Sequence, residues 1–107
     1  MAYEIVLAPG AVASFKELSA KRRAEVRDAV EVHLRREPTK VSKSRIKRLR
    51  GLSRPQFRLR VGELRVFYDV TESEVQVLAI VSKAEAEAWL EEEGVASEGG
   101  GARESEG

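Results

Sequence analysis

Residues 56–70, QFRLRVGELRVFYDV, constrain the fold of this chain most strongly, because they predict a β-hairpin. The first arm alternates strictly between apolar residues and arginines, which is the period of a strand with one apolar face: Phe57, Arg58, Leu59, Arg60 and Val61. The hairpin turn is expected at Gly62-Glu63, since glycine beside a polar residue supplies the positive φ of a two-residue loop.

This turn predicts the register of the two arms. The apolar face then holds three cross-strand pairs: Val61 with Leu64, Leu59 with Val66, and Phe57 with Tyr68. On the reverse face Arg60 lies opposite Arg65, and Arg58 lies opposite Phe67. Like charges directly across a strand pair are destabilising, so we expect this face to hold an anion. The alternative is a solvated sheet face with the arginine charges in water.

The distribution of charge supports an anion site. Although the net charge is only +1, residues 40–65 carry ten basic residues against one acidic residue, a local charge of +9. Residues 66–107 carry eleven acidic residues against two basic ones, a charge of −9. Such a block indicates a local polyanion site. Mutual neutralisation of the two blocks in the fold is the alternative.

Composition excludes several classes of function. The 107 residues suffice for one domain with one modest core. The chain has no cysteine and one histidine, so we expect no disulfide, no metal site and no cofactor. Its apolar runs are too short to span a bilayer and no leader segment opens the chain, so we expect a cytoplasmic protein without membrane contact.

The remaining segments predict an α+β fold, a small antiparallel sheet backed by an N-terminal two-helix hairpin, with a short C-terminal helix. The predicted elements are a strand over 3–7, helices from Pro9 to about Leu18 and from Ser19 to about Arg36, an ordered basic loop over 39–55, a strand over 75–81, and a helix from a Ser82/Glu85 capping box to Gly94. We expect one domain over 1–93 and a disordered acidic Gly/Ser tail over 94–107.

The arginine face is the strongest candidate for function. Arg58, Arg60 and Arg65 project from rigid strands, so their guanidinium groups suit bidentate contacts with phosphate. Basic residues of the preceding loop, among them Lys47, Arg48 and Arg50, would extend the patch along a nucleic-acid backbone. Phe67 and Trp89 offer flat surfaces for base stacking. For Trp89 the alternative is packing in the core.

Cleavage of RNA requires proton carriers as well as cations. Arginine stabilises charge well but moves protons badly, because its pKa lies above ~12. Four nearby residues are candidates, and no motif distinguishes any of them: Lys83, Glu85, Glu87 and Asp69. The single histidine, His33, lies on the apolar stripe of the second helix, so we expect a packing role for it.

Three features resemble the RelE/ParE toxin superfamily: the segment Lys47-Arg48-Leu49-Arg50-Gly51, the hairpin with its R-x-R-V-G-x-x-R-V-x-Y string, and the strand-to-helix exit IVSK…EAW. The similarity covers about residues 3–92. It implies a small antiparallel sheet backed by two helices. It also implies a cytoplasmic toxin that either cuts mRNA in the ribosome or poisons DNA gyrase. A cognate antitoxin would hold this toxin inactive.

By position, the resemblance implies that Arg58, Arg60 and Arg65 bind and stabilise the scissile phosphate, with Lys83 assisting. Trp89 falls where many members carry a tyrosine. The leading hypothesis is therefore a ribosome-dependent mRNA endoribonuclease, an mRNA interferase that inhibits translation. A ParE-like gyrase poison, and a degenerate member that only binds antitoxin or RNA, are the alternatives.

Overall fold

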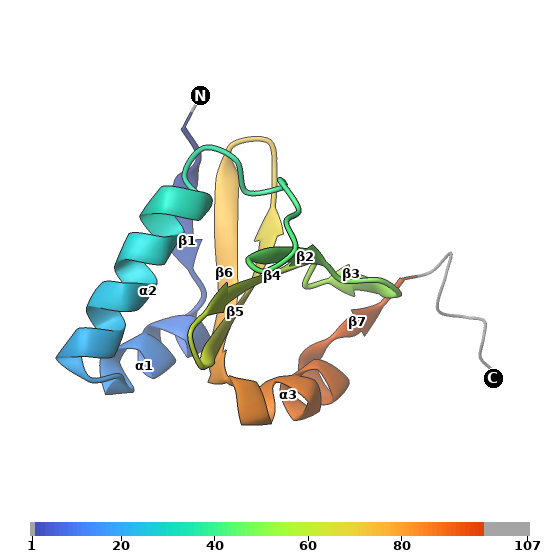
Figure 1. Ribbon diagram of the computed structural model, residues 1–107. Helices are drawn as coiled ribbons and strands as arrows, with labels where there is room; N and C mark the ends of the chain where they lie inside the picture. The colour runs from blue at the N-terminus through green and yellow to red at the C-terminus, as the bar shows by residue number, and fades with distance from the viewer. Residues whose placement is uncertain (1, 98–107) are drawn as a thin grey trace.

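A five-stranded sheet in the order β1-β6-β5-β4-β2 forms the centre of the computed structural model, which describes residues 2–97 (Figure 1). Its strands are β1 (Glu4–Leu7), β2 (Ile46–Arg48), β4 (Phe57–Val61), β5 (Leu64–Val70) and β6 (Glu74–Ser82). The helices are α1 (Pro9–Glu17), α2 (Ala20–His33), the 3₁₀ turn η1 (Lys83–Glu85) and α3 (Ala86–Glu93). A second, two-stranded sheet pairs β3 (Leu52–Arg54) with β7 (Val95–Ala96).

The hairpin of β4 and β5 has the predicted register at every pair. Phe57 lies opposite Tyr68 and Arg58 opposite Phe67, and the pairing continues to Val61 and Leu64 beside the turn. Gly62 in the turn has a φ of +57°, in the left-handed region that favours glycine. The hairpin was predictable because its pairing depends on neighbouring residues and one short turn.

The sheet is mixed, which differs from the antiparallel sheet that we predicted. β1 runs parallel to β6, with Glu4 opposite Glu74 and Leu7 opposite Val77, whereas the other pairs of this sheet are antiparallel. Parallel neighbours require a long crossover, and here the chain passes through α1, α2 and the hairpin before it returns as β6. The predicted α+β class, with a two-helix hairpin on one face of the sheet, is confirmed.

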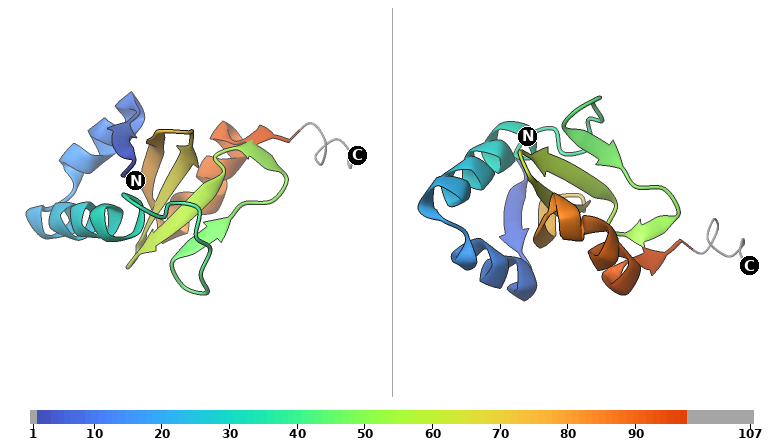
Figure 2. Two further views of the ribbon diagram at one scale, coloured as in Figure 1. Left: turned by 90° about the horizontal axis from the view of Figure 1, so that it is seen from above. Right: turned by 60° about the horizontal axis from the view of Figure 1, so that its bottom comes forward.

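The two N-terminal helices cover one face of the sheet, and α3 lies on the other side, as the view from above shows (Figure 2). Buried residues of α1 and α2 join the apolar hairpin face in one core; they include Ala11, Val26, Val30, Leu59 and Val66. Among residues 2–97, no helix is both long and apolar enough to cross a membrane.

Local signals place the helix ends well. Pro9 is the first residue of α1, and the Ser19 hydroxyl caps α2 by accepting the Arg22 N–H at 3.2 Å. α2 ends at His33, three residues before the predicted end. Beyond it the Arg35 carbonyl accepts the N–H of Tyr3 at 2.7 Å, a tertiary bond to the β1 segment in place of a helical one.

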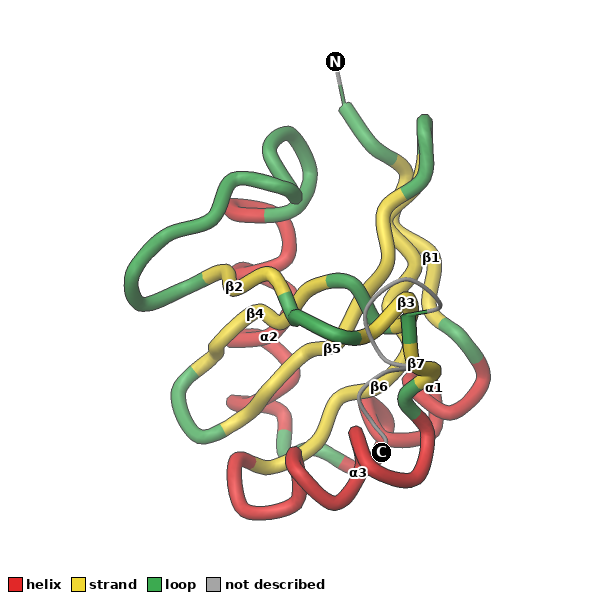
Figure 3. Tube along the Cα trace, turned by 90° about the vertical axis from the view of Figure 1, so that its right-hand side faces the viewer, coloured by secondary structure: helices red, strands yellow, loops and turns green. Residues whose placement is uncertain are grey.

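The predicted basic loop over residues 39–55 contains two short strands, so this part of the prediction is wrong. β2 pairs with β4 because Ile46 is buried opposite Leu59, and β3 pairs with β7 through Leu52 and Ala96. Three residues show too little periodicity to predict a strand, and the partner of β3 lies more than forty residues further along the chain. Figure 3 shows the loop after α2 leading into β2 at one edge of the sheet.

The C-terminal helix begins and ends as predicted. The Ser82 hydroxyl accepts the Glu85 N–H at 3.2 Å, and at the other end Gly94 donates its N–H to the Leu90 carbonyl at 2.9 Å. Val95–Ala96 then forms β7 on β3, where we predicted the start of a disordered tail. The rest of that predicted tail, residues 98–107, lies outside the described residues.

Candidate nucleic-acid interface

The face of the sheet opposite α1 and α2 carries the predicted cluster of cations. The register places Arg60 opposite Arg65, and Lys47 opposite Arg58. Residues directly opposite each other share a face, so these four side chains lie on adjacent positions of three neighbouring strands. We call Arg58, Arg60 and Arg65 the arginine cluster, and the face that bears it the arginine face.

The three arginines differ strongly in exposure. Arg60 is exposed, Arg58 is half-buried, and Arg65 is only 8% exposed. The Nη1 atom of Arg65 donates to the carbonyls of Gly62 and Leu64 at 2.9 and 2.8 Å. These bonds fix the Arg65 guanidinium beside the hairpin turn. Arg65 therefore stabilises the hairpin turn as well as contributing to the positive charge of the hairpin.

Arg58 is the least satisfied member of the cluster. Its Nε atom is buried and has no hydrogen-bond partner among residues 2–97. Burial lowers the pKa of Arg58, and repulsion from Arg65 and Arg60 lowers it further. Within the same residues the ion pairs involve other side chains, so no carboxylate neutralises the cluster. A bound anion would accept a hydrogen bond from the unpaired Arg58 Nε–H, and it would reduce the repulsion among the three guanidinium groups.

Lys83 lies at the turn end of the hairpin. Its backbone N–H donates to the Glu63 carbonyl at 2.7 Å, and its side chain is exposed at the start of η1. Arg60 and Arg65 are the second cross-strand pair from this turn, after Val61 and Leu64. The fold therefore brings Lys83 to the same end of the arginine face as these two arginines, although it is distant from them in sequence.

The predicted stacking residue Phe67 is not available to a base, and this part of the site prediction is corrected. Phe67 has no exposed surface, because the indole ring of Trp89 lies parallel over it with ring centroids 5.1 Å apart. Trp89 itself is half-buried. One aromatic surface thus remains at this position, and it belongs to Trp89.

The predicted basic extension is divided between the two faces. Lys47 lies on the arginine face, but the next residue of β2 points to the other side, as strand geometry requires. There the Arg48 guanidinium lies 5.1 Å from the centre of the Phe57 ring. Arg50 is exposed in the turn between β2 and β3. Of the three predicted loop cations, only Lys47 directly extends the arginine cluster.

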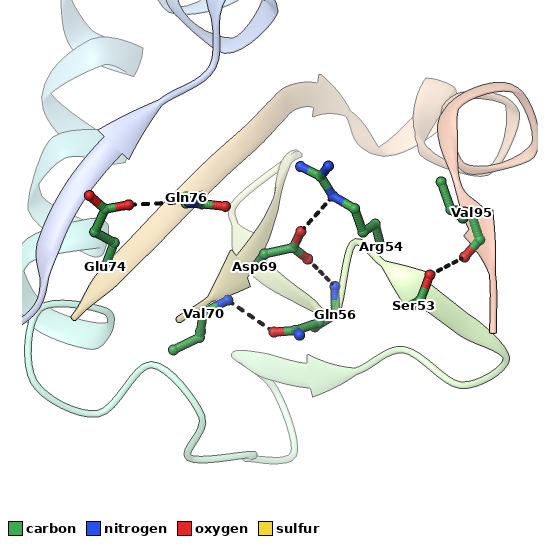
Figure 4. A network of polar contacts seen from close by, with 8 residues as sticks. All are labelled: Ser53, Arg54, Gln56, Asp69, Val70, Glu74, Gln76 and Val95. Carbon is green, nitrogen blue, oxygen red and sulfur yellow. Dashed lines mark hydrogen bonds and ion pairs between the residues drawn. The ribbon is translucent and has the colours of Figure 1, made fainter. Parts of the chain in front are cut away.

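Asp69, considered above as a proton carrier, holds the chain in place. Its Oδ2 atom accepts the Arg54 Nε–H at 2.8 Å, and its Oδ1 atom accepts the backbone N–H of Gln56 at 2.8 Å (Figure 4). The Gln56 side chain in turn accepts the N–H of Val70 at 2.9 Å. This network could not be predicted from the sequence, because its members pair across the hairpin and no motif distinguishes them.

Two further residues from the sequence analysis are His33 and Glu85. His33 is at the end of α2, on the opposite face, beside a cavity of about 250 Å³ that Arg45 and Ile46 also line. Glu85 is held at the start of the final helical segment by Ser82, whose hydroxyl accepts the Glu85 N–H and donates to the Glu85 carboxylate at 3.1 Å. Within residues 2–97 no group of three or more histidine, aspartate or glutamate side chains has a geometry that could hold a metal ion.

No protein-family model matches this sequence, and no curated protein matches it either. Its structure, in contrast, is similar to several solved ones. The archaeal RelE–RelB complex from Pyrococcus horikoshii has a TM-score of 0.64 at 21% identity, over 78% of this chain and 97% of the matched chain. The toxin–antitoxin complex RelBE2 from Mycobacterium tuberculosis has a TM-score of 0.60 at 24% identity, over 77% and 99%.

The RelB–RelE antitoxin–toxin complex from Methanococcus jannaschii is similar at a TM-score of 0.59 and 17% identity, over 78% of this chain and 96% of the matched one. The chain therefore has an α+β fold of the RelE type, as the resemblance implied. This fold carries an arginine cluster on the face of the sheet that α1 and α2 leave uncovered.

Proposed function

We propose that this chain is the toxin of a toxin–antitoxin pair, a ribosome-dependent endoribonuclease that cleaves mRNA. The observation that carries the proposal is the arginine cluster, in which a buried Arg58 Nε–H has no partner among the described residues and no carboxylate balances the charge. The RelE-type fold supports the toxin class, because the similar structures are toxin–antitoxin complexes.

In this function the arginine cluster acts on the scissile phosphate. Attack by a 2′-hydroxyl concentrates negative charge on the phosphate oxygens, and rigid cations stabilise that charge without reorganising. Arg65 is fixed by two carbonyls, and Arg58 is confined by burial. Lys83, at the turn end, assists from the start of η1. The role of the three arginines is therefore electrostatic.

The partner follows from the same structures. The similar structures are toxin–antitoxin complexes, so we propose that a cognate antitoxin binds this chain and keeps it inactive. A protein that covers the arginine face needs acidic groups to neutralise its charge. A pull-down with the product of the neighbouring reading frame tests this, and Arg60→Glu should weaken the complex.

Translation with purified protein tests cleavage directly. We expect new mRNA 5′ ends in ribosome-bound message, and loss of these ends with the Arg58→Ala/Arg60→Ala double variant. Lys16→Ala, which removes an exposed cation from α1 on the opposite side, is the matched control and should cleave normally. Intact message at saturating wild-type protein would overturn the cleavage proposal.

A gyrase poison is the second candidate. The observation in its favour is that Arg58, Arg60 and Arg65 bind anions well but transfer protons badly, whereas RNA cleavage requires proton transfer. Inhibition of DNA supercoiling by the purified protein, together with normal translation, would favour it over RNA cleavage.

A further inference from the structure

A cavity of about 240 Å³ lies where α3, β6 and the β3–β7 sheet meet. Five residues line it: Arg54, Leu78, Trp89, Glu93 and Val95. Pockets for drug-sized ligands start at about 300 Å³, so this cavity suits one ring system rather than a larger ligand. None of the five residues belongs to the arginine cluster.

The flat wall of the cavity is held rigidly. Trp89 is stacked on Phe67 with only 5° between the ring planes, and Phe67 is fully buried. Leu78 adds an apolar surface to the cavity. It is the extra residue of a β-bulge in β6, because its neighbours Ala79 and Val77 pair with the consecutive β5 residues Phe67 and Tyr68. Bulges often redirect a side chain next to a functional site. An indole with such support gives a planar ligand a surface that needs no ordering on binding.

The cationic wall is also preorganised. The Nε atom of Arg54 is bonded to the buried carboxylate of Asp69, and Figure 4 shows both Nη atoms pointing away from it. The Arg54 side chain is 54% exposed, so these Nη atoms are accessible to a ligand. β3, which carries Arg54, is tied to β7 by a bond from the Ser53 hydroxyl to the Val95 carbonyl.

The anionic wall is Glu93 in the last turn of α3. That turn contains no basic residue, and the negative end of the helix dipole disfavours a carboxylate there. Glu93 therefore does not serve helix stability. It lines the same cavity as Arg54 without forming an ion pair with it, so both charged groups are available for a ligand.

The geometry points to a guanine base as the occupant of this cavity. Guanine carries two acceptors, O6 and N7, on one edge, and these suit the Nη donors of Arg54. Its adjacent edge carries two donors, N1–H and N2–H, which suit the carboxylate of Glu93. No other RNA base presents both edges. Its ring would stack on Trp89, as bases stack on aromatic side chains in single-stranded RNA sites.

This inference deepens the proposed function, on which its biological meaning rests. Phe67, under Trp89, lies opposite Arg58, so the indole wall borders the arginine cluster. Positions on one face of a strand repeat at about 7 Å. A guanine in the cavity would thus belong to a nucleotide at or beside the phosphate on the arginine cluster, and the cavity would select the sequence that is cut.

Binding can be measured without a ribosome or cleavage. Trp89 is the single tryptophan, so the chain has one indole N–H resonance in its NMR spectrum. We expect guanosine monophosphate to shift this resonance at concentrations about tenfold below the other three nucleotides, which is the order of discrimination that a bidentate contact gives. Ribose 5-phosphate, which lacks the base, should leave the resonance in place.

Glu93→Gln provides a sharp variant because its amide keeps one acceptor and replaces the other by a donor, so it can no longer accept both N1–H and N2–H of guanine. We expect it to lose most of the tenfold preference for guanosine monophosphate, so that the four nucleotides shift the resonance at similar concentrations. Glu92→Gln, an exposed neighbour on α3 outside the cavity, is the control and should retain the guanine preference.

Equal shifts with all four nucleotides, a shift with ribose 5-phosphate alone, no shift with any nucleotide, or an unchanged preference in Glu93→Gln would each overturn the guanine site. The proposed function fails separately, through intact mRNA in the translation assay. Guanine binding without cleavage would support the guanine site and overturn the nuclease function. Cleavage without guanine preference would support the nuclease function and overturn the guanine site.

Discussion

The indole of Trp89 lies parallel to the ring of Phe67, with centroids 5.1 Å and planes 5° apart. This stack is the main aromatic contact between α3 and the sheet, and it leaves Phe67 with no exposed surface. Trp89→Ala should lower the free energy of unfolding by about 2–4 kcal/mol, somewhat less than for a fully buried aromatic residue, because Trp89 is partly exposed. Urea unfolding followed by circular dichroism measures the change.

Trp89→Phe is the control for that stack, because it keeps an aromatic ring over Phe67, and its loss of stability should be smaller than that of Trp89→Ala. Equal losses in the two variants would show that stacking does not account for the stability of α3.

Asp69 should be a structural residue rather than a proton carrier. Asp69→Asn replaces an oxygen acceptor by an amide donor, so either Arg54 or the Gln56 N–H loses its partner. We expect a loss of about 1–3 kcal/mol in unfolding free energy, the cost of leaving a polar group of this network unsatisfied. The exposed Asp28→Asn on α2 is the matched control. An unfolding midpoint equal to that of the wild type would refute the role assigned to Asp69.

Tyr68 should make stability depend on pH in the alkaline range. Its buried hydroxyl donates to the Pro38 carbonyl at 2.6 Å, and burial raises its pKa well above the ordinary value of 10.0. Above that pH the unfolded chain loses this proton while the folded chain keeps it, so the free energy of unfolding falls as pH rises. Unfolding between pH 8 and pH 11 should show this slope, and Tyr68→Phe should reduce it.

Tyr68→Phe should also cost about 1–2 kcal/mol at neutral pH, since it leaves the Pro38 carbonyl without its donor. Tyr3→Phe at the half-buried second tyrosine is the comparison. An alkaline slope that is the same in wild type and Tyr68→Phe would contradict the assignment.

Gly94 should be required because a side chain there would clash with its surroundings, and not because its backbone conformation excludes other residues. Its φ is −70°, yet a Cβ atom there would come within 2.5 Å of the Leu90 carbonyl oxygen. Gly94→Ala should therefore displace β7 and lower the thermal midpoint. Gly10→Ala in α1, where a Cβ would meet nothing within 4 Å, should be neutral or stabilise by about 0.5–1 kcal/mol. The opposite order of the two midpoints would refute this explanation.

RNA affinity should depend on salt through the arginine face. For single-stranded RNA each phosphate contact contributes about −0.7 to the slope of log K against log salt concentration. Arg60→Ala should therefore reduce the slope by about that amount, measured by titration of a short oligonucleotide. Lys21→Ala, an exposed cation of α2 on the opposite side, should leave the slope unchanged. A change with Lys21→Ala but not with Arg60→Ala would place the RNA elsewhere.

The elements predicted correctly are those whose determinants are close together in sequence. The register of β4 and β5 follows from alternation and one glycine turn. The Ser19 and Ser82 hydroxyls cap helical segments by accepting the N–H of the residue three positions later. The strands β2 and β3 were missed because each is only three residues long and depends on a partner elsewhere.

The same distinction applies to the site. Alternation placed Arg58, Arg60 and Arg65 on one face, but it contains no information on what covers that face. Burial of Arg65 beside the turn carbonyls, the loss of Phe67 under Trp89, and the position of Arg48 over Phe57 all depend on contacts between elements.

The sequence by itself determined the hairpin, its register and the concentration of positive charge, because pleat geometry and turn chemistry act over a few residues. Only the tertiary structure decided that β1 runs parallel to β6, that α3 covers Phe67, and that Arg54 and Glu93 line one cavity with Trp89. These relationships join residues distant in the chain, and packing against the whole core selects among many partners that sequence periodicity leaves equivalent.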